Sequence, residues 1–483
     1  MAAEELAAFH WRGPCLARAR KLARVLLNGK PVGNFWETIQ GSTIVSQIAA
    51  VPSLSKETSS SSELNRVVFA SSIGTIIEWY DFLIYGTAAA LVFNKLFFPA
   101  ADPFLGTLAA LGSAAVGFFA RPFGGALFGY MGDRLGRKSM LLLTLAIMGL
   151  ATFAIGLLPT YDSIGIWAPI LLVTLRIVQG IGLGGEWGGA ALMVVEHAPA
   201  HRRGLCGSLV QTGFPVGLIL STAAYSAISA LPEQALLSWG WRVPFLASIV
   251  LVAIGTFIRH RVSESPVFLE MKARNEIARN PLAEAIGNNR REFVVAIGLK
   301  LCEVSWVYLV TVFLVVYATT HLGLSRSTML NAILVASVIE VAAIPFFGHL
   351  SDRIGRRPMF FMGTAFTIVF AFPLFWMMDT RDPTLVFCAV AMGLILGQGL
   401  MFGVEATYFP ELFGARARYT GASFGFQVAA AIGGGLTPVF ATLLVEKFGG
   451  TTGVSVLLIG VALITLVAAL FARETKDDPI GHE

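Results

Sequence analysis

Residues 129–138 read Gly-Tyr-Met-Gly-Asp-Arg-Leu-Gly-Arg-Lys, and residues 348–357 read Gly-His-Leu-Ser-Asp-Arg-Ile-Gly-Arg-Arg. The two aspartates, Asp133 and Asp352, are 219 residues apart in this chain of 483 residues. Each copy lies between two long apolar segments. A repeat of this kind indicates a membrane protein made of two homologous helix bundles, each with its own charged hairpin.

The composition indicates that lipid surrounds most of the chain. Charged residues make up 13% of it and hydrophobic residues 55%, whereas a typical soluble protein has about 25% charged residues. The net charge of +5 comes from short basic loops between apolar segments, so it does not indicate nucleic-acid binding. The four cysteines have no ligand-like spacing, and we expect no disulfide, metal site or cofactor.

Twelve segments are long and apolar enough to cross a membrane, which takes about 20 residues. They are 67–95, 104–129, 139–158, 164–195, 205–230, 242–259, 294–318, 324–350, 359–378, 384–409, 419–445 and 451–472. The sequence therefore predicts an all-α integral membrane fold of twelve transmembrane helices in two pseudo-symmetric six-helix bundles. The predicted bundles are 66–259 and 293–472, joined by a central loop at 260–292 and followed by a tail at 473–483.

Basic residues predict which ends of these helices face the cytoplasm. The loops after even-numbered segments carry most of the arginine, including both hairpins, Arg202 and Arg203, and Arg416 and Arg418. The positive-inside rule places these loops in the cytoplasm. Both termini and the central loop are then cytoplasmic as well.

The first 65 residues differ from the rest, with a basic stretch at 10–30 and a serine-rich stretch at 52–63. We expect this extension to be disordered, or translated from sequence upstream of the native start codon. A surface-bound amphipathic helix and an organellar presequence are the alternatives.

The hairpins resemble the signature loop of the major facilitator superfamily, and Arg176-Ile177-Val178-Gln179-Gly180 resembles its second motif. Glu78-Trp79-Tyr80-Asp81-Phe82, Arg121-Pro122-Phe123-Gly124-Gly125 and Gly184-Gly185-Glu186-Trp187-Gly188-Gly189-Ala190 are similar to the metabolite:proton symporter family. The resemblance covers 66–472. It implies a functional monomer in a bacterial inner membrane that moves a small organic acid or polar metabolite together with protons by alternating access, and it implies no enzyme activity.

The resemblance implies that the hairpins form a conformational latch, closed in one state and open in the other. The glycines permit a tight turn, and an aspartate is stabilised at a nearby helix N-terminus. The alternative is that the hairpins only set topology. The predicted latch residues are Asp133, Arg134, Arg137, Lys138, Glu196, Arg203, Asp352, Arg353, Arg356, Arg357, Glu411 and Arg416, with Arg202 and Arg418 as further partner candidates.

Charged residues inside a membrane are costly and are candidate functional sites. The predicted proton-coupling or substrate residues are Glu78, Asp81, Arg176, Gln179, Glu186, Lys300, Glu303 and Gln398. For Arg176, Glu78 and Asp81 we favour function over a structural ion pair. For Lys300 and Glu303, a functional role and a simple ion pair near the helix end are equally compatible with the sequence. For Glu186, a cap at a helix break and a proton relay are both open. Arg121 and Glu340 are predicted to be helix-interface charges.

Several functions compete with organic-acid symport. A proline/betaine-type symporter and a drug:proton antiporter share parts of these motifs. A transporter-like sensor predicts an added signalling domain, and a membrane enzyme predicts a clustered nucleophile or metal set; neither is visible in the sequence. Shikimate or a dicarboxylate is the favoured substrate, because cationic groups suit a carboxylate.

Overall fold

The computed structural model describes residues 61–99, 103–229, 231–274, 276 and 280–478. The chain divides into two units, Met1–Glu57 and Thr58–Glu483, and everything below concerns the second. The predicted extension at 1–65 lies outside the described residues, apart from its last five, which begin the first helix.

The helices of the first half follow the predicted apolar segments closely. They are α4 (Ser61–Ala88), α5 (Asn94–Leu96), α6 (Pro103–Leu135), α7 (Arg137–Leu157), α8 (Tyr161–Ile164), α9 (Trp167–His197), α10 (Arg203–Gln211), α11 (Gly213–Ser229), α12 (Glu233–Ala235) and α13 (Arg242–His260). Two short helices, α14 (Pro266–Ala273) and α15 (Pro281–Ala283), occupy the central loop.

The second half repeats this order. Its helices are α16 (Arg290–Tyr308), α17 (Leu314–Thr320), α18 (Arg326–Ile354), α19 (Arg356–Asp379), α20 (Pro383–Met392), α21 (Gly399–Leu412), α22 (Arg418–Phe448) and α23 (Thr452–Phe471). The π-helical turns Leu309–Phe313 and Gly393–Gln398 join α16 to α17 and α20 to α21. Such turns are frequent at functional sites, and the second one ends on Gln398.

Eleven helical segments in the described residues meet the length and hydropathy criteria for a membrane span. The long helix α6, which is almost entirely apolar between Pro103 and Gly132, supplies the twelfth. The predicted all-α fold of twelve spanning helices is thereby confirmed.

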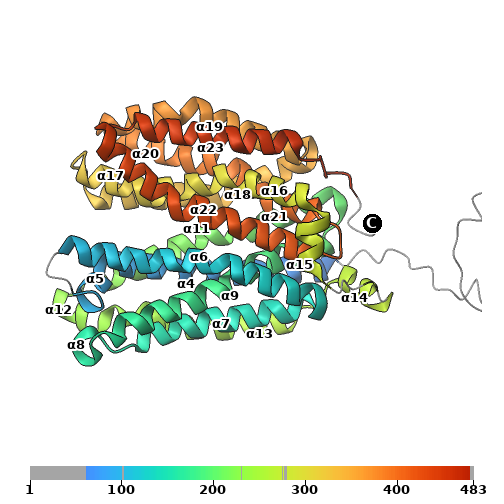
Figure 1. Ribbon diagram of the computed structural model, residues 1–483, viewed down its shortest axis with the longest axis horizontal. Coiled ribbons are helices and arrows are strands. Elements are labelled where there is room, and N and C mark those ends of the chain that lie inside the picture. Colours follow the sequence, from blue (N-terminus) through green and yellow to red (C-terminus); the bar gives the residue numbers. More distant parts are fainter. Residues whose placement is uncertain (1–60, 100–102, 230, 275, 277–279, 479–483) are drawn as a thin grey trace, which may run out of the picture. The chain divides into compact units, whose positions relative to one another are not determined.

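The two halves lie side by side, with α4, α6, α7, α9 and α13 on one side and α16, α18, α19, α22 and α23 on the other (Figure 1). Contacts between the halves run along two seams. Helix α6 packs against α22, and α10 and α11 pack against α18. The helices α14 and α15 lie at one end of the bundles, while α5, α8, α12 and α17 lie at the opposite end (Figure 1).

Each hairpin reverses the chain at a glycine. Gly136, between α6 and α7, has a φ of 112°, and Gly355, between α18 and α19, has a φ of 105°. Side chains other than glycine rarely adopt this backbone conformation, so both copies of the hairpin need glycine there. We call the end of the bundles that carries these two turns the hairpin end.

Glycine also sets how closely the halves approach at the hairpin end. A Cβ placed on Gly129 of α6 lies 2.7 Å from the Cα of Thr420 in α22. By contrast, a Cβ on Gly112, also in α6, meets nothing within 4 Å. The seam between α6 and α22 therefore depends on the missing side chain at position 129.

We expect Gly129→Val to force α6 and α22 apart, because overpacking a tight contact costs about 1–3 kcal/mol. The reporter is Ser208→Cys in a background without the native cysteines, since Ser208 is fully buried beside Gly348 where α10 meets α18. Maleimide labelling of the reporter should accelerate with Gly129→Val. The matched Gly112→Val should label at the parental rate. Equal rates for both would show that the seam does not depend on this glycine.

Candidate functional site

At the hairpin end, Asp133 binds the opposite half of the protein. Its carboxylate accepts hydrogen bonds from the backbone N–H groups of Tyr419 (3.3 Å) and Thr420 (3.0 Å) and from the Thr420 hydroxyl (2.8 Å). These residues open helix α22. The first N–H groups of a helix have no partner within the helix, and the helix dipole favours an anion there. Asp133 therefore caps a helix of the second half.

Asp352 makes the reciprocal contact. Its carboxylate accepts hydrogen bonds from the N–H groups of Gly204 (2.7 Å) and Leu205 (2.9 Å), in the first turn of α10. The hairpin of each half thus caps a helix of the other half, as expected for two copies of one unit facing each other across a pseudo-two-fold axis.

Buried arginines hold these aspartates in place. Arg137 lies 3.3 Å from Asp133 and 3.6 Å from Glu196, and Arg418 reaches Glu196 from the second half at 3.4 Å. In the second copy, Arg356 lies 2.9 Å from Asp352 and 3.3 Å from Glu411. The predicted partners Glu196 and Glu411 are thus brought to the hairpins.

Two further carboxylates cap the helix that follows each hairpin. Glu264 accepts from the N–H groups of Arg137 (3.0 Å) and Lys138 (3.2 Å), which open α7. Glu474 accepts from those of Arg356 (2.8 Å) and Arg357 (3.0 Å), which open α19. We did not predict either glutamate. The signal was present, because a glutamate followed by a hydroxyl residue comes shortly after the last span of each half.

Those hydroxyl residues extend the network. Ser265 donates to Glu196, and Thr475 donates to Glu411 at 2.6 Å. The tail also crosses to the first half, since Arg203 of α10 donates to the backbone carbonyl of Asp478 at 2.8 Å. The segment after α23 is thus part of the contact between the halves.

Five predicted latch residues lie outside the contacts between the halves. Arg134 and Arg353 are exposed, because they follow the aspartate directly in the last turn of α6 and α18 and point about 100° away from it. The head groups of Lys138 and Arg357 bind carbonyls of their own half, at His260 (2.9 Å) and Ala469 (3.0 Å). Arg416 is half-exposed and pairs with Glu284 at 3.2 Å, so that Arg418 takes the role expected of Arg416.

Deeper in the first half, Arg176 and Gln179 form one unit on α9. Arg176 Nη1 donates to Gln179 Oε1 at 2.5 Å, and Gln179 Nε2 donates to the Thr152 hydroxyl at 2.8 Å and to the Asp81 carbonyl at 3.3 Å. All of these side chains are buried. The glutamine therefore orients the guanidinium and ties it to α4 and α7.

Two guanidinium groups flank the ring of Phe82. Arg176 lies 4.4 Å from the ring centroid and Arg121 lies 4.2 Å from it. Arg121 also lies over Phe118 (4.4 Å) and Arg176 over Tyr85 (4.1 Å). Neither arginine has an ion-pair partner among the residues that the structure describes. This aromatic-lined pair of cations can bind an anion.

Both halves contain buried polar groups with unused hydrogen-bonding capacity. Within the described part of the chain, neither carboxylate oxygen of Asp81 or Glu340 has a hydrogen-bond partner, and the Gln398 amide has none. One oxygen of Glu78 is also unpaired, and the charges of Arg121 and Arg259 act on this residue. Polar groups that are left unpaired in an interior are costly, so these residues are candidates for binding a ligand or a proton.

Glu186 has a different environment from the one we expected. Helix α9 is continuous from Trp167 to His197, so the prediction that Glu186 caps a helix break is wrong. Its carboxylate pairs with Arg259 of α13 and accepts from the Thr144 hydroxyl at 2.6 Å. Arg259 was not among the predicted residues, because it sits at the end of its span.

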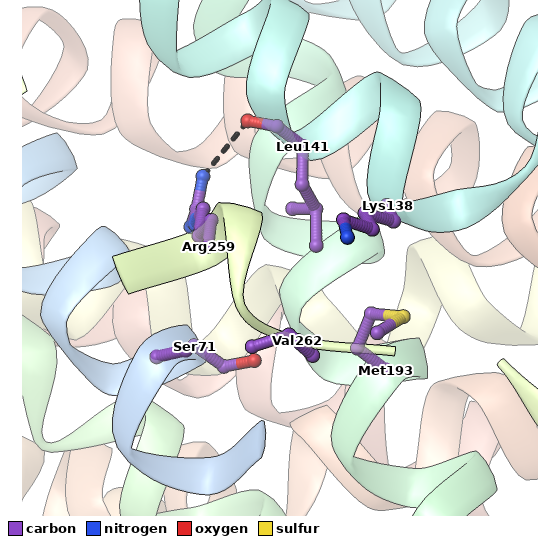
Figure 2. A pocket seen from close by; sticks show the side chains of 7 residues that line it. Ser71, Lys138, Leu141, Met193, Arg259 and Val262 are labelled. Atoms are coloured by element: carbon purple, nitrogen blue, oxygen red, sulfur yellow. Dashed lines mark hydrogen bonds between the residues drawn. The ribbon is translucent and has the colours of Figure 1, made fainter. Parts of the chain in front are cut away.

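Arg259 also faces a small crevice of about 10 Å³, just enough for one water molecule. Figure 2 shows Arg259 donating to the carbonyl of Leu141, at 2.9 Å, beside Lys138 and Met193. Glu186 and Arg259 form a buried ion pair within the first half.

In the second half, Lys300 of α16 contacts two carboxylates, Glu303 on the same helix and Glu405 of α21. Lys300 is 3% exposed, so it does not extend to the membrane surface as the simple end-of-helix pair would require. Glu405 is 219 residues after Glu186. The pseudo-equivalent glutamates thus each pair with a cation, but with cations from different helices.

The geometry defines a multi-pass membrane transporter, with two pseudo-symmetric halves, reciprocal latches at one end and buried charged groups between the helices. Known proteins agree with this class. The family model of the Major Facilitator Superfamily matches residues 69–431 and 304–482. The "Shikimate transporter" of Escherichia coli (strain K12) is 43% identical over 426 residues, covering 87% of this chain and 97% of the relative.

Two further similarities point the same way. The "Inner membrane metabolite transport protein YhjE" of Escherichia coli (strain K12) is 41% identical over 418 residues, covering 85% of this chain and 94% of the relative. The solved structure of the proton:xylose symporter XylE bound to 6-bromo-6-deoxy-D-glucose has the same fold, with a TM-score of 0.69 at 19% identity over 86% of this chain and 97% of that one. This chain belongs to the major facilitator superfamily, and the predicted resemblance is confirmed. Members of this family are transporters and not enzymes.

We expect Asp133→Asn to weaken closure at the hairpin end, because an amide is a poorer acceptor at a helix N-terminus than a carboxylate. A bias of about 1–3 kcal/mol changes the ratio of open to closed states by a factor of about 5–150. Labelling of the Ser208→Cys reporter should accelerate. Turnover should fall more than substrate affinity, since Asp133 lies at the hairpin end and not beside Arg121 and Arg176.

Arg134→Gln is the matched control for this experiment. Arg134 lies in the same hairpin but donates only within its own helix, to the Tyr130 hydroxyl at 2.5 Å. We expect labelling and turnover near the parental values. If Asp133→Asn changes affinity alone, or if Arg134→Gln opens the latch equally, the latch assignment is wrong.

Proposed function

We propose that this transporter carries a small carboxylate-bearing metabolite, such as shikimate or a dicarboxylate, in symport with protons across a bacterial inner membrane. The arrangement of Arg121, Phe82 and Arg176 beside Asp81 is the observation that carries the proposal. The names of the relatives support it, since one is a shikimate transporter and the XylE neighbour is a proton:xylose symporter.

The two arginines supply the anion site. A guanidinium presents parallel N–H donors that match a carboxylate. Arg121 Nε and Nη2 and Arg176 Nε have no hydrogen-bond partner within the described residues. Both groups lie over the ring of Phe82, which stabilises each cation. Gln398, whose buried amide is unpaired on the π-helical turn, is proposed to supply a further donor and acceptor.

Asp81 and Glu78 are the proposed proton carriers. A carboxylate within a membrane span is costly when it is ionised and unpaired. Binding a proton removes that cost, and a neighbouring substrate anion favours the proton further. Anion and proton therefore bind more favourably together than apart, which is the requirement for symport.

The hairpin end is proposed to be cytoplasmic, with both termini on that side, because arginine and lysine are concentrated there. The latch then closes the cytoplasmic entrance while the site exchanges with the outside. Opening of the latch releases substrate and proton to the cytoplasm. The predicted domain boundaries at 66–259 and 293–472 correspond to the two moving halves in this scheme.

We expect uptake to depend on the proton gradient. Labelled shikimate, with other organic acids screened in parallel, is supplied to cells that express the protein. A protonophore should abolish accumulation, whereas removal of sodium should leave it unchanged. Sodium-dependent accumulation that persists with the protonophore present would contradict proton coupling.

We expect Arg176→Lys to reduce proton-driven uptake severely with normal membrane levels. Lysine keeps the charge but, as a point charge, it cannot engage Gln179 and a carboxylate together as a planar fork does. The readout is initial uptake rate over a range of substrate concentrations, and at least a tenfold loss is the expected size, roughly 1.4 kcal/mol.

Arg326→Lys is the control for this substitution, because Arg326 is exposed in the first turn of α18. It should transport at the parental rate. Parental uptake by Arg176→Lys would show that only a positive charge is needed, and the anion site would have to lie elsewhere.

A further inference from the structure

The group around Lys300 contains more acid than base. Its ammonium contacts Glu405 Oε2 at 2.7 Å and also a carboxylate oxygen of Glu303, one helical turn along α16. The three side chains are 3%, 0% and 1% exposed for Lys300, Glu405 and Glu303, respectively. Two carboxylates therefore share one ammonium away from water.

The surrounding helices do not supply a second cation to either glutamate in the described part of the chain. Apart from Lys300 and each other, the titratable groups near them are Tyr308 and Cys302 on α16 and Glu340 on α18. Arg121 reaches Tyr308 but forms no ion pair with either glutamate. A buried charge without a partner is strongly unfavourable, and two carboxylates that share a site do not both ionise. One of the pair must hold a proton.

The first half provides the contrast. Glu186, the pseudo-equivalent of Glu405, has Arg259 as its own cation and the Thr144 hydroxyl as a donor. One carboxylate with one guanidinium needs no proton. The Glu186 pair therefore differs from the Lys300 group in the number of carboxylates that contact the cation, one in the first case and two in the second.

Aromatic side chains from both halves cover the Lys300 group. The ammonium lies 4.0 Å from the centroid of Phe426 on α22, and Phe426 stacks on Trp187 of α9 with centroids 3.7 Å apart. Trp187 donates to Gln211 at 2.9 Å, and Gln211 donates to the carbonyl of Phe402 at 3.1 Å. Separation of the halves removes Trp187 and admits water to the carboxyl pair.

We propose that Glu303 and Glu405 form a second proton site, which holds one transported proton while the hairpin end is closed and releases it when that end opens. On opening, the protonated carboxyl gives its proton to water on the hairpin side and becomes a carboxylate. Lys300 keeps its charge and stays with one carboxylate, while water solvates the other. This second proton site rests on the proposed function, because release of its proton contributes to transport only if transport is driven by protons.

The test counts protons without substrate. Purified full-length protein in lipid vesicles carries the Ser208→Cys reporter, and its maleimide labelling rate is measured against pH. If opening releases a proton from this site, the ratio of open to closed protein rises by up to tenfold per pH unit. The rise is confined to the pH range between the pKa of the site in the open state and its pKa in the closed state. The reporter's own thiolate chemistry is the same in every variant and cancels in the comparison.

Glu405→Gln and Glu303→Gln each mimic the protonated acid and leave one carboxylate with Lys300. We expect either substitution to lower the pH slope of opening by about one proton, so that the tenfold change per pH unit from this site disappears. Glu405→Asp keeps the titrating pair and should retain the parental slope. Glu446→Gln, an exposed glutamate on α22, is the matched control and should also retain it.

Parental slopes in folded Glu405→Gln and Glu303→Gln proteins would overturn the proposal. If only one glutamine variant folds, its slope decides. The outcome is separate from that of the proposed function, which fails if the protonophore has no effect on wild-type uptake. If wild-type uptake is proton-driven and both glutamine variants keep the parental slope, only the second proton site is wrong.

Discussion

A carboxylate at the N-terminus of a helix in the opposite half is the contact on which this structure depends. Asp133 caps α22 and Asp352 caps α10, so each half holds the other. Capping contacts are worth about 0.5–2 kcal/mol each, and water can replace the carboxylate on the exposed N–H groups. The halves are therefore joined by bonds that are directional enough to fix one arrangement and weak enough to be broken in each cycle.

The sequence was sufficient for the parts of the structure that follow from local rules. Twelve apolar segments became twelve helices because a span in lipid must satisfy its own backbone hydrogen bonds. Asp133 and Arg137 were found because both belong to the repeated hairpin motif. The turn at Gly136, and not a shared helix face, brings them together. Glu411 and Glu196 were expected as partners because of their positions at the ends of spans.

Residues whose partners are distant in sequence were harder to assign. Arg259 and Glu186 are 73 positions apart, and nothing local to either residue specifies the pairing. Arg416 and Arg418 lie in the same basic loop and are both candidate partners by sequence, but only Arg418, which begins α22, reaches Glu196. Long-range ion pairs are decided by how the helices pack, which one sequence does not specify.

Helix α9 connects the latch to the interior, because it carries Arg176 near its middle and Glu196 at its last turn. Twenty residues of α-helix span about 30 Å, so a single rigid element reaches from the anion site to the arginines of the hairpin. Between them, Trp187 stacks on Phe426 of α22, the same helix that Asp133 caps. In the proposed mechanism, a ligand at Arg176 and a proton near Lys300 would therefore act on α9 and α22, which meet at the Trp187–Phe426 stack. Coupling between distant sites needs an element with two arrangements that both sites bias, and the α9–α22 pair has the contacts to be that element.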